Sequence, residues 1–371
     1  MHVSFCRSGC VKKQINETMT SRERVLRAFE RVPADRVPVD FQANPGVDVR
    51  LKKHFGLSAG DNEGLLRALG VDFRAIDAPY KGPRLHPEVN GRNVDPLWGI
   101  RTRWIEHSTG GYWEACDFPL QNADAEQVAR WPMPDPDQYD YSGVADACRR
   151  YDLYAQHILC YGDLINGNGF LRGMELTLID LVTDDPAGAL LGDRRFAIQL
   201  ATTERILDAA KGRIDFVWLG EDLGTQERPM VSREVFRRHI RPRYQKFVDL
   251  ARSYKARTMI HTCGSSSWAY EDFIEMGIDA VDTLQPECRD MSPRSLVERF
   301  GGRLSFHGCI STAGALAFGT PREVRRAVKE TLDVMMPGCS YMLAPTHEIQ
   351  DNSPTENVVA MYEAAQELGW Y

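Results

Sequence analysis

Two side chains that can bind a metal, His261 and Cys263, stand two positions apart at the end of an apolar segment. In an extended strand, residues i and i+2 point to the same side. An imidazole and a thiolate placed in this way can share one ion at about 2.0–2.3 Å, and zinc favours this pair of ligands. The same spacing also suits a hydrogen-bonded core histidine beside a small apolar cysteine.

Two ligands do not hold zinc, so we expect at least one more. His347 and Cys309 each lie just past an expected strand end, where a side chain can face the same edge as His261. We predict His347 as the third ligand, with Cys309 as the alternative. Cys339 stands at the start of the last expected strand, at the opposite end, and we discount it.

Carboxylates follow another apolar segment, at Glu221 and Asp222. Adjacent residues of a strand point to opposite faces, so we expect only one of them to face the site. There it can serve as a fourth metal ligand, a general acid or a substrate anchor. The alternative is that one of the pair caps a helix or pairs with Arg228. We predict Glu221 as the catalytic acid, and we predict substrate-binding roles for residues at several strand ends: Gln42, Asp163, Asp222, Gln285 and His307.

Eight short, mostly apolar segments carry these residues and alternate with longer helical patterns. Such segments are typical of parallel strands covered on both faces. They predict an α/β fold, a (β/α)8 barrel whose functional residues gather at the carboxyl ends of the strands. The expected strands are 36–41, 71–78, 158–163, 215–221, 257–261, 278–284, 304–309 and 340–345.

The clearest helices are expected at 22–31, 196–210, 232–254, 321–334 and 354–368. The region 80–157 is too long for a barrel loop, and residues 100–118 alternate in period two about a Ser-Thr-Gly-Gly turn, which predicts a hairpin. We interpret 19–371 as a single barrel domain with an insertion at about 80–157 over the barrel mouth. Residues 1–18 are interpreted as a flexible extension.

The composition excludes several classes of protein. The chain has 371 residues, of which 43% are hydrophobic and 26% charged, as in globular proteins. The formal charge of −7 gives no sign of nucleic-acid binding, and no apolar run is long enough for a membrane span. Nine irregularly spaced cysteines indicate a reducing compartment, so we expect a cytoplasmic protein.

Several strings resemble the uroporphyrinogen decarboxylase superfamily, and the resemblance covers about residues 19–369. They are RVLRAF at 24–29, DRVPV at 35–39, HTCG at 261–264, FHGCI at 306–310, YMLAPTHEIQ at 341–350 and PTENVVAMY at 354–362. The resemblance also implies a (β/α)8 barrel. True decarboxylases of this superfamily carry arginines after the first strand that hold the substrate carboxylates, whereas residues 41–46 here read FQANPG.

The other branch of the superfamily contains zinc- and corrinoid-dependent methyltransferases, and the chain is closer to this branch. The resemblance implies that His261 and Cys263 are zinc ligands. The later cysteine of that branch follows the last strand in a Pro-Gly-Cys context, and this chain has Pro345-Thr346-His347 there. Either His347 replaces the thiolate or the third ligand lies elsewhere, with Cys309 next in line.

We therefore expect a zinc methyltransferase that works with a separate corrinoid (cobalamin) protein on a small methylated substrate, with a second copy of the chain as a candidate partner in a homodimer. Replacing cysteine by histidine removes one negative charge, which favours a Lewis-acid role and demethylation of a methoxylated compound, with aromatic compounds among the candidates. Two alternatives remain open. One is a metal-independent decarboxylase of a smaller acid, and the other is a catalytically inactive binding barrel.

Overall fold

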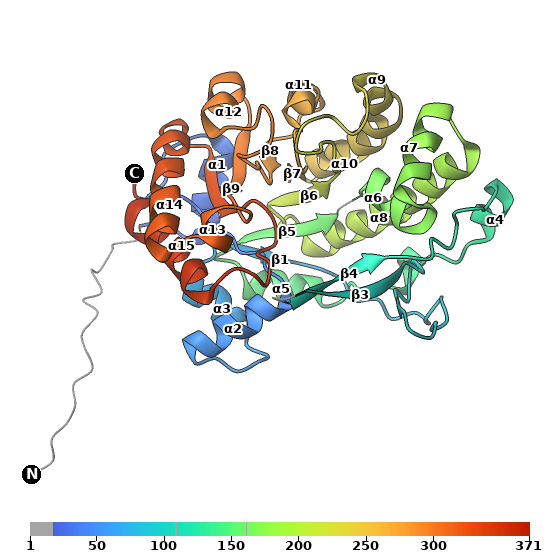
Figure 1. Ribbon diagram of the computed structural model, residues 1–371, viewed down its shortest axis with the longest axis horizontal. Helices are drawn as coiled ribbons and strands as arrows, with labels where there is room; N and C mark the ends of the chain where they lie inside the picture. The colour runs from blue at the N-terminus through green and yellow to red at the C-terminus, as the bar shows by residue number, and fades with distance from the viewer. Residues whose placement is uncertain (1–17, 108–109, 161) are drawn as a thin grey trace, which may run out of the picture.

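Seven parallel strands form a curved sheet, and helices follow them along the chain (Figure 1). The structure is a computed structural model that describes residues 18–107, 110–160 and 162–371. The order of the strands in the sheet follows the chain: β1 (Phe73–Ala75), β5 (Ala155–Cys160), β6 (Phe216–Gly220), β7 (Arg257–His261), β8 (Ala280–Asp282), β9 (Ser305–Ile310) and β10 (Tyr341–Pro345).

The segment 37–40 closes the barrel between the first and last strands of this sheet. The amide of Asp40 donates to the carbonyl of Leu343 in β10, and the amide of Leu343 donates to Pro38. On the other side, the amide of Asp72 donates to the carbonyl of Val39. The segment supplies the eighth position of the predicted barrel, although its pairing is limited to isolated bridges.

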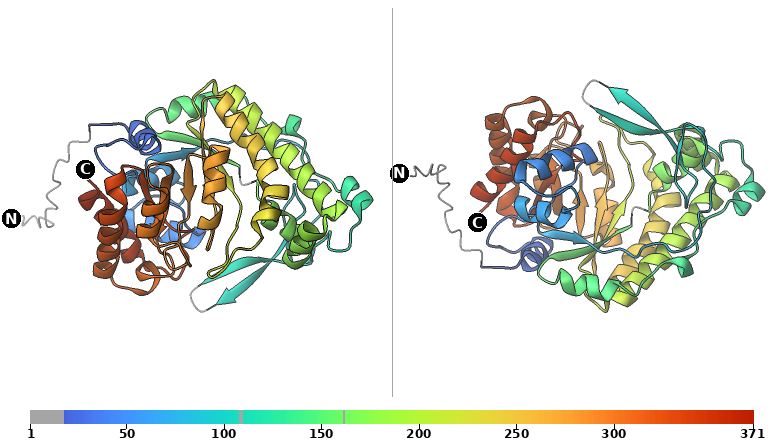
Figure 2. Two further views of the ribbon diagram at one scale, coloured as in Figure 1. Left: turned by 90° about the horizontal axis from the view of Figure 1, so that it is seen from above. Right: turned by 90° about the horizontal axis from the view of Figure 1, so that it is seen from below.

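Helices surround the strands, as the two views of Figure 2 show. Their bounds before β6 are α1 Ser21–Glu30, α2 Pro45–Phe55, α3 Asn62–Leu69, α4 Ala125–Arg130, η1 Pro136–Gln138, α5 Val144–Arg150, α6 Leu164–Arg172, α7 Met174–Thr183 and α8 Pro186–Ala210. After β6 they are α9 Arg233–Val235, η2 Phe236–Ile240, α10 Arg241–Ser253, η3 Ser267–Ala269, α11 Tyr270–Met276, α12 Pro293–Phe300, α13 Ala315–Phe318, α14 Pro321–Met335, η4 Met336–Gly338 and α15 Thr355–Leu368. No helix in the described ranges is both long enough and apolar enough to span a membrane.

Helix α1 packs against the amino-terminal end of the barrel. It starts with a capping box, in which the Thr20 hydroxyl accepts from the amide of Glu23 and the Glu23 carboxylate accepts from the amide of Thr20. Phe29 of α1 contacts Phe216 at the start of β6, with 5.3 Å between ring centroids. The barrel is therefore covered at this end, and its open end is the carboxyl edge of the strands.

Several predicted boundaries were wrong. The helix expected at 196–210 begins ten residues earlier, at Pro186, and β5 ends at Cys160 rather than 163. The third strand starts at Ala155 rather than 158, because Gln156 donates to carbonyls of Cys148 and Tyr151 outside the sheet while His157 packs inside the barrel. The helix expected over 232–254 contains a π-helical turn, η2, directly before Pro242. Proline has no amide hydrogen to donate, which explains why the regular pattern is interrupted there.

The predicted hairpin is present as β3 (Arg101–His107) and β4 (Gly110–Ala115), with β2 (Asn93–Val94) added beside β3. Its expected turn at 108–109 lies outside the described residues, as does nearly all of the expected extension 1–18. Gly110 approaches Asp351, since a Cβ at this glycine would lie 3.0 Å from the Asp351 Cβ. The insertion therefore reaches the loop that follows β10.

Candidate metal centre

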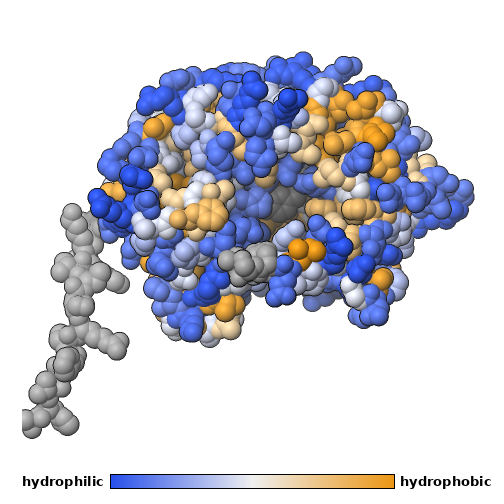
Figure 3. Space-filling model, in the orientation of Figure 1, coloured by the Kyte–Doolittle hydropathy of each residue, from blue (hydrophilic) through white to orange (hydrophobic). Residues whose placement is uncertain are grey.

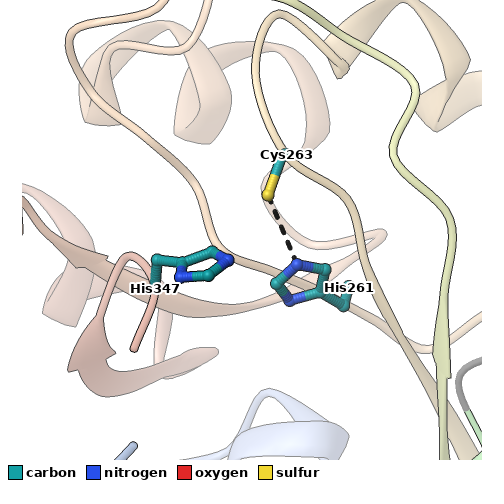
Figure 4. A group of neighbouring side chains, drawn as sticks. All are labelled: His261, Cys263 and His347. Atoms are coloured by element: carbon teal, nitrogen blue, oxygen red, sulfur yellow. Dashed lines mark hydrogen bonds between the residues drawn. The ribbon is translucent and has the colours of Figure 1, made fainter. Parts of the chain in front are cut away.

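Three side chains predicted as metal ligands meet at the carboxyl edge of the sheet (Figure 4). One ligand atom each from His261, Cys263 and His347 lies within 4.8 Å of the others. The Cys263 Sγ is 3.3 Å from the His261 Nε2, and the two imidazole rings are 5.8 Å apart between centroids. Two nitrogens and one sulfur around one point form a donor set typical of zinc.

His261 is held by its second ring nitrogen. Its Nδ1 lies 2.8 Å from the Asp282 Oδ2 and 2.9 Å from the Thr283 Oγ1, so its Nε2 is turned toward Cys263. A carboxylate on the far nitrogen fixes the ring and increases its basicity as a ligand. Burial alone would lower the pKa of His261, but the bonds to Asp282 and Cys263 raise that pKa well above its usual value.

Asp282 is shared between two histidines. Its Oδ1 is 2.6 Å from the His307 Nδ1, and the His307 Nε2 is 3.2 Å from the Asp40 Oδ2. Burial opposes charge on His307, but the facing carboxylates outweigh burial and raise its pKa to about 9. For Asp282 the same pairing lowers the pKa despite burial. A buried carboxylate–imidazole chain thus runs from the first barrel segment to His261.

Cys263 is positioned by the loops after β6 and β8. Its amide donates to the Asp222 Oδ1 at 3.1 Å, and the amide of Gly264 donates to the Gln285 Oε1 at 2.7 Å. Gly264 has φ of +70°, and a Cβ there would lie 2.2 Å from the carbonyl oxygen of Gly224. Only glycine allows this close approach of the two loops. Burial raises the pKa of Cys263 to about 11 before any ion is bound.

His347 lies two residues past the end of β10. The loop around it is tied to the first barrel segment, because Ala43 bridges to Ile349 and the amide of Asn44 donates to Ile349 at 2.9 Å. Burial and then the charge of His261 lower the pKa of His347, which favours the neutral, metal-binding imidazole. Cys309, the predicted alternative, is buried beyond this group, and its pKa is raised to about 12 by burial.

The two predicted carboxylates have different surroundings. Glu221 is buried, and its oxygens accept from the amides of Leu164 and Ile165, which start α6, and from the Tyr244 hydroxyl. Asp222 is half-buried at the centre itself, with its Oδ1 3.8 Å from the His261 Nε2. The structure therefore places Asp222 beside the candidate ligands and Glu221 behind α6.

The remaining predicted substrate-binding residues lie around this centre in different ways. Asp163 caps α6 by accepting from the amide of Asn166, and burial together with Asp222 raises its pKa to about 6. Gln285 supports the Cys263 loop, and His307 is buried below the centre. Gln42 is half-buried, and its backbone carbonyl accepts from the amide of Ile349 in the loop that carries His347.

The sequence-based reasoning missed the residues that hold His261 in place, Asp282 and Thr283. A signal was present, because Asp282 ends the expected sixth strand directly beside the strand that carries His261. Carboxylates at adjacent strand ends meet at one edge of a parallel sheet, and a metal-binding histidine needs such a partner.

The comparison with protein families assigns part of the chain. The uroporphyrinogen decarboxylase (URO-D) family model matches residues 222–368. This segment is similar to uroporphyrinogen decarboxylase domains. It contains all three candidate ligands and confirms the superfamily expected from the sequence. A search of curated proteins gives no match.

Comparison with solved structures extends the likeness in fold to the whole barrel. One of them, a methyltransferase from Methanosarcina mazei, superposes with a TM-score of 0.62 and 18% sequence identity, over 94% of this chain and 99% of that chain. At this identity the likeness concerns the fold, and it confirms the predicted (β/α)8 architecture.

Proposed function

We propose that this chain is a zinc-dependent methyltransferase that moves a methyl group between a small methylated substrate and the cobalt of a separate corrinoid protein. The observation that carries the proposal is the convergence of His261, Cys263 and His347 at the open end of a URO-D-type barrel. The likeness to a methyltransferase fold supports it.

The donor atoms fit zinc in type and number. Three protein ligands leave one tetrahedral position for a substrate, which is the arrangement of catalytic zinc sites. A zinc ion there supplies Lewis acidity that weakens the bond between a methyl group and its oxygen or sulfur. With two neutral imidazoles and one thiolate, the ligands carry a single negative charge, which favours this role and therefore demethylation of a methoxylated compound.

The chain's own residues orient the substrate and the ligands. Asp282 and Thr283 fix the ring of His261. The carboxylate of Asp222 accepts from the Cys263 amide, and the Asp222 side chain is itself half-buried. We assign Asp222 and Gln42 to hydrogen bonds with the substrate, because the Asp222 Oδ1 lies 3.8 Å from the His261 Nε2 and Gln42 is bonded through its backbone to the loop that carries His347. Glu221, our sequence-based candidate for the acid, is assigned to supporting the start of α6 beside Asp163.

Metal analysis of the purified chain tests this proposal. We expect about one zinc per chain and its loss in the variants His261→Ala, Cys263→Ser and His347→Ala. His54→Ala is the matched control, because His54 is an exposed histidine of α2 and should leave the zinc content unchanged.

Methyl transfer is then measured with free cob(I)alamin and methylcobalamin, whose cobalt spectra differ. The zinc-loaded chain should convert one into the other when a methoxylated compound or its demethylated product is supplied. A metal-free chain that releases carbon dioxide from a small acid would overturn the proposal in favour of a decarboxylase, and no spectral change with any substrate would favour an inactive barrel.

A further inference from the structure

Leu159 is a large apolar side chain exposed to solvent near the carboxyl end of a buried strand, β5. It is 45% exposed, whereas its neighbours in β5, Ile158 and Cys160, are 3% and 5% exposed. Surface leucines are common, but β5 is an interior strand of the barrel, paired on both sides. Because both edges of β5 are paired, solvent can reach Leu159 only from one face of the sheet.

The side chain of Leu159 points into the barrel. Gln156 points outward, since its amide donates to carbonyls around α5, and side chains alternate along a strand. His157 points inward, because its ring stacks on Phe216 at 5.0 Å and packs on Trp218 at 5.3 Å. Leu159 therefore lies on the same inner row as His157, one step nearer the open end. Figure 3 shows one face of the molecule, which is hollowed near its centre.

The strand register places Leu159 across the mouth from the metal centre. Leu159 pairs with Trp218 and Trp218 pairs with Met259, two residues before His261. Two strand spacings and two residues correspond to about 10 Å across and about 7 Å along the sheet. A substrate held at His261 by its oxygen would need a body of roughly aromatic-ring size to reach the leucine.

The charged side chains at the barrel mouth disfavour an anionic substrate. A carboxylate stands directly at the metal centre, because the Asp222 Oδ1 lies 3.8 Å from the His261 Nε2. An anionic group on the substrate would face the carboxylates of Asp222 and Asp163, and Arg195, the cation beside Asp163, is buried and already donates to the Asp163 carbonyl and to Asn168.

We propose that Leu159 is a specificity-determining residue, the apolar wall against which the enzyme packs the uncharged aromatic body of a methoxylated substrate. This inference rests on the proposed function and adds the substrate class to it. Leu159 contacts the part of the substrate that does not react, so it selects the substrate without taking part in the methyl transfer.

Binding of 2-methoxyphenol to the full zinc-loaded chain, measured by titration calorimetry, tests the inference without any corrinoid. Leu159→Ala removes most of the apolar contact and should weaken binding roughly tenfold. Leu159→Trp fills the opening and should weaken it at least about as much. Zinc content should equal that of the wild type in both variants, which shows that the barrel is intact.

Leu153→Trp is the matched control, because Leu153 is 63% exposed and lies before β5, at the other end of the barrel. It should change binding by less than about twofold. Methoxybenzoate, the anionic counterpart, should bind at least about tenfold more weakly than 2-methoxyphenol to the wild type.

Three results would overturn the inference: no binding of 2-methoxyphenol to the wild type, equal binding by Leu159→Trp and Leu153→Trp, or tighter binding of methoxybenzoate. Failure of the proposed function is distinguishable, because it would appear as absent methyl transfer to cobalamin by a zinc-loaded chain whose calorimetric binding still follows the expected order.

Discussion

Replacing Asp282 by asparagine should weaken zinc binding without touching a ligand. The carboxylate accepts from His261 at 2.8 Å and from His307 at 2.6 Å. Asparagine keeps the shape but has one acceptor oxygen, so its amide group must face one of two donor nitrogens. Loss of such a partner lowers metal affinity by about 10–100-fold, or roughly 1.4–2.7 kcal/mol.

The same substitution should also destabilise the metal-free protein. His307 is fully buried and carries its charge against Asp282 and Asp40. Breaking a buried pair by removing one charge costs about 3 kcal/mol. The free energy of unfolding of Asp282→Asn, measured with urea in the presence of a chelator, should fall by about this amount.

Asp40→Asn separates the two effects, because Asp40 contacts His307 at 3.2 Å on the side away from His261. This variant should lose stability and keep zinc affinity within about twofold of wild type, as measured by competition with a chromophoric chelator. If Asp40→Asn weakens zinc as much as Asp282→Asn does, or if Asp282→Asn binds zinc as tightly as wild type, the assignment of Asp282 to His261 is refuted.

Three further predictions concern the fold and the third ligand. Burial opposes charge on Asp35, but the ion pair with Arg24 outweighs burial and lowers the pKa of Asp35 to about 2. The stabilising effect of the Asp35 carboxylate is therefore complete above about pH 4 and is lost as the pH falls toward 2. The unfolding free energy measured with urea should decline by at most about 2 kcal/mol over this range, and a decline of the same size in Asp35→Asn would contradict this. Thr320→Ala removes the capping box with Glu323 at the start of α14 and should cost about 1 kcal/mol in the same assay, whereas Thr320→Ser should retain most of it. His347→Cys in the cobalt(II)-substituted protein should about double the thiolate-to-cobalt absorbance, and unchanged absorbance would show that residue 347 does not bind the ion.

The barrel was predictable because its strands are apolar on both faces. Segments such as 257–261 and 340–345 have few polar residues, and the structure places β7 and β10 there almost to the residue. The pairing of residues 37–40 with the strands on either side was harder to predict. Pro38 has no amide hydrogen to donate to a neighbouring strand, and only isolated bridges form.

The metal centre was predictable in its ligands and less so in its support. The spacing of His261 and Cys263 follows from strand geometry, and the position of His347 follows from the strand end before it. The shared carboxylate of Asp282 was not predicted, because its two partners come from different strands. The direction of the Glu221 side chain was not predictable either, because it depends on amides at the start of α6.

All three candidate ligands fall within the segment that the family model matches, yet the ring of strands that aligns them is completed only by residues 38–44. Without residues 38–44, the loop that carries His347 would lose its hydrogen bonds at Ile349, and β10 would become an edge strand, paired only with β9. A fragment beginning near residue 222 would therefore carry every coordinating atom and still fail to chelate zinc with the affinity of the intact protein.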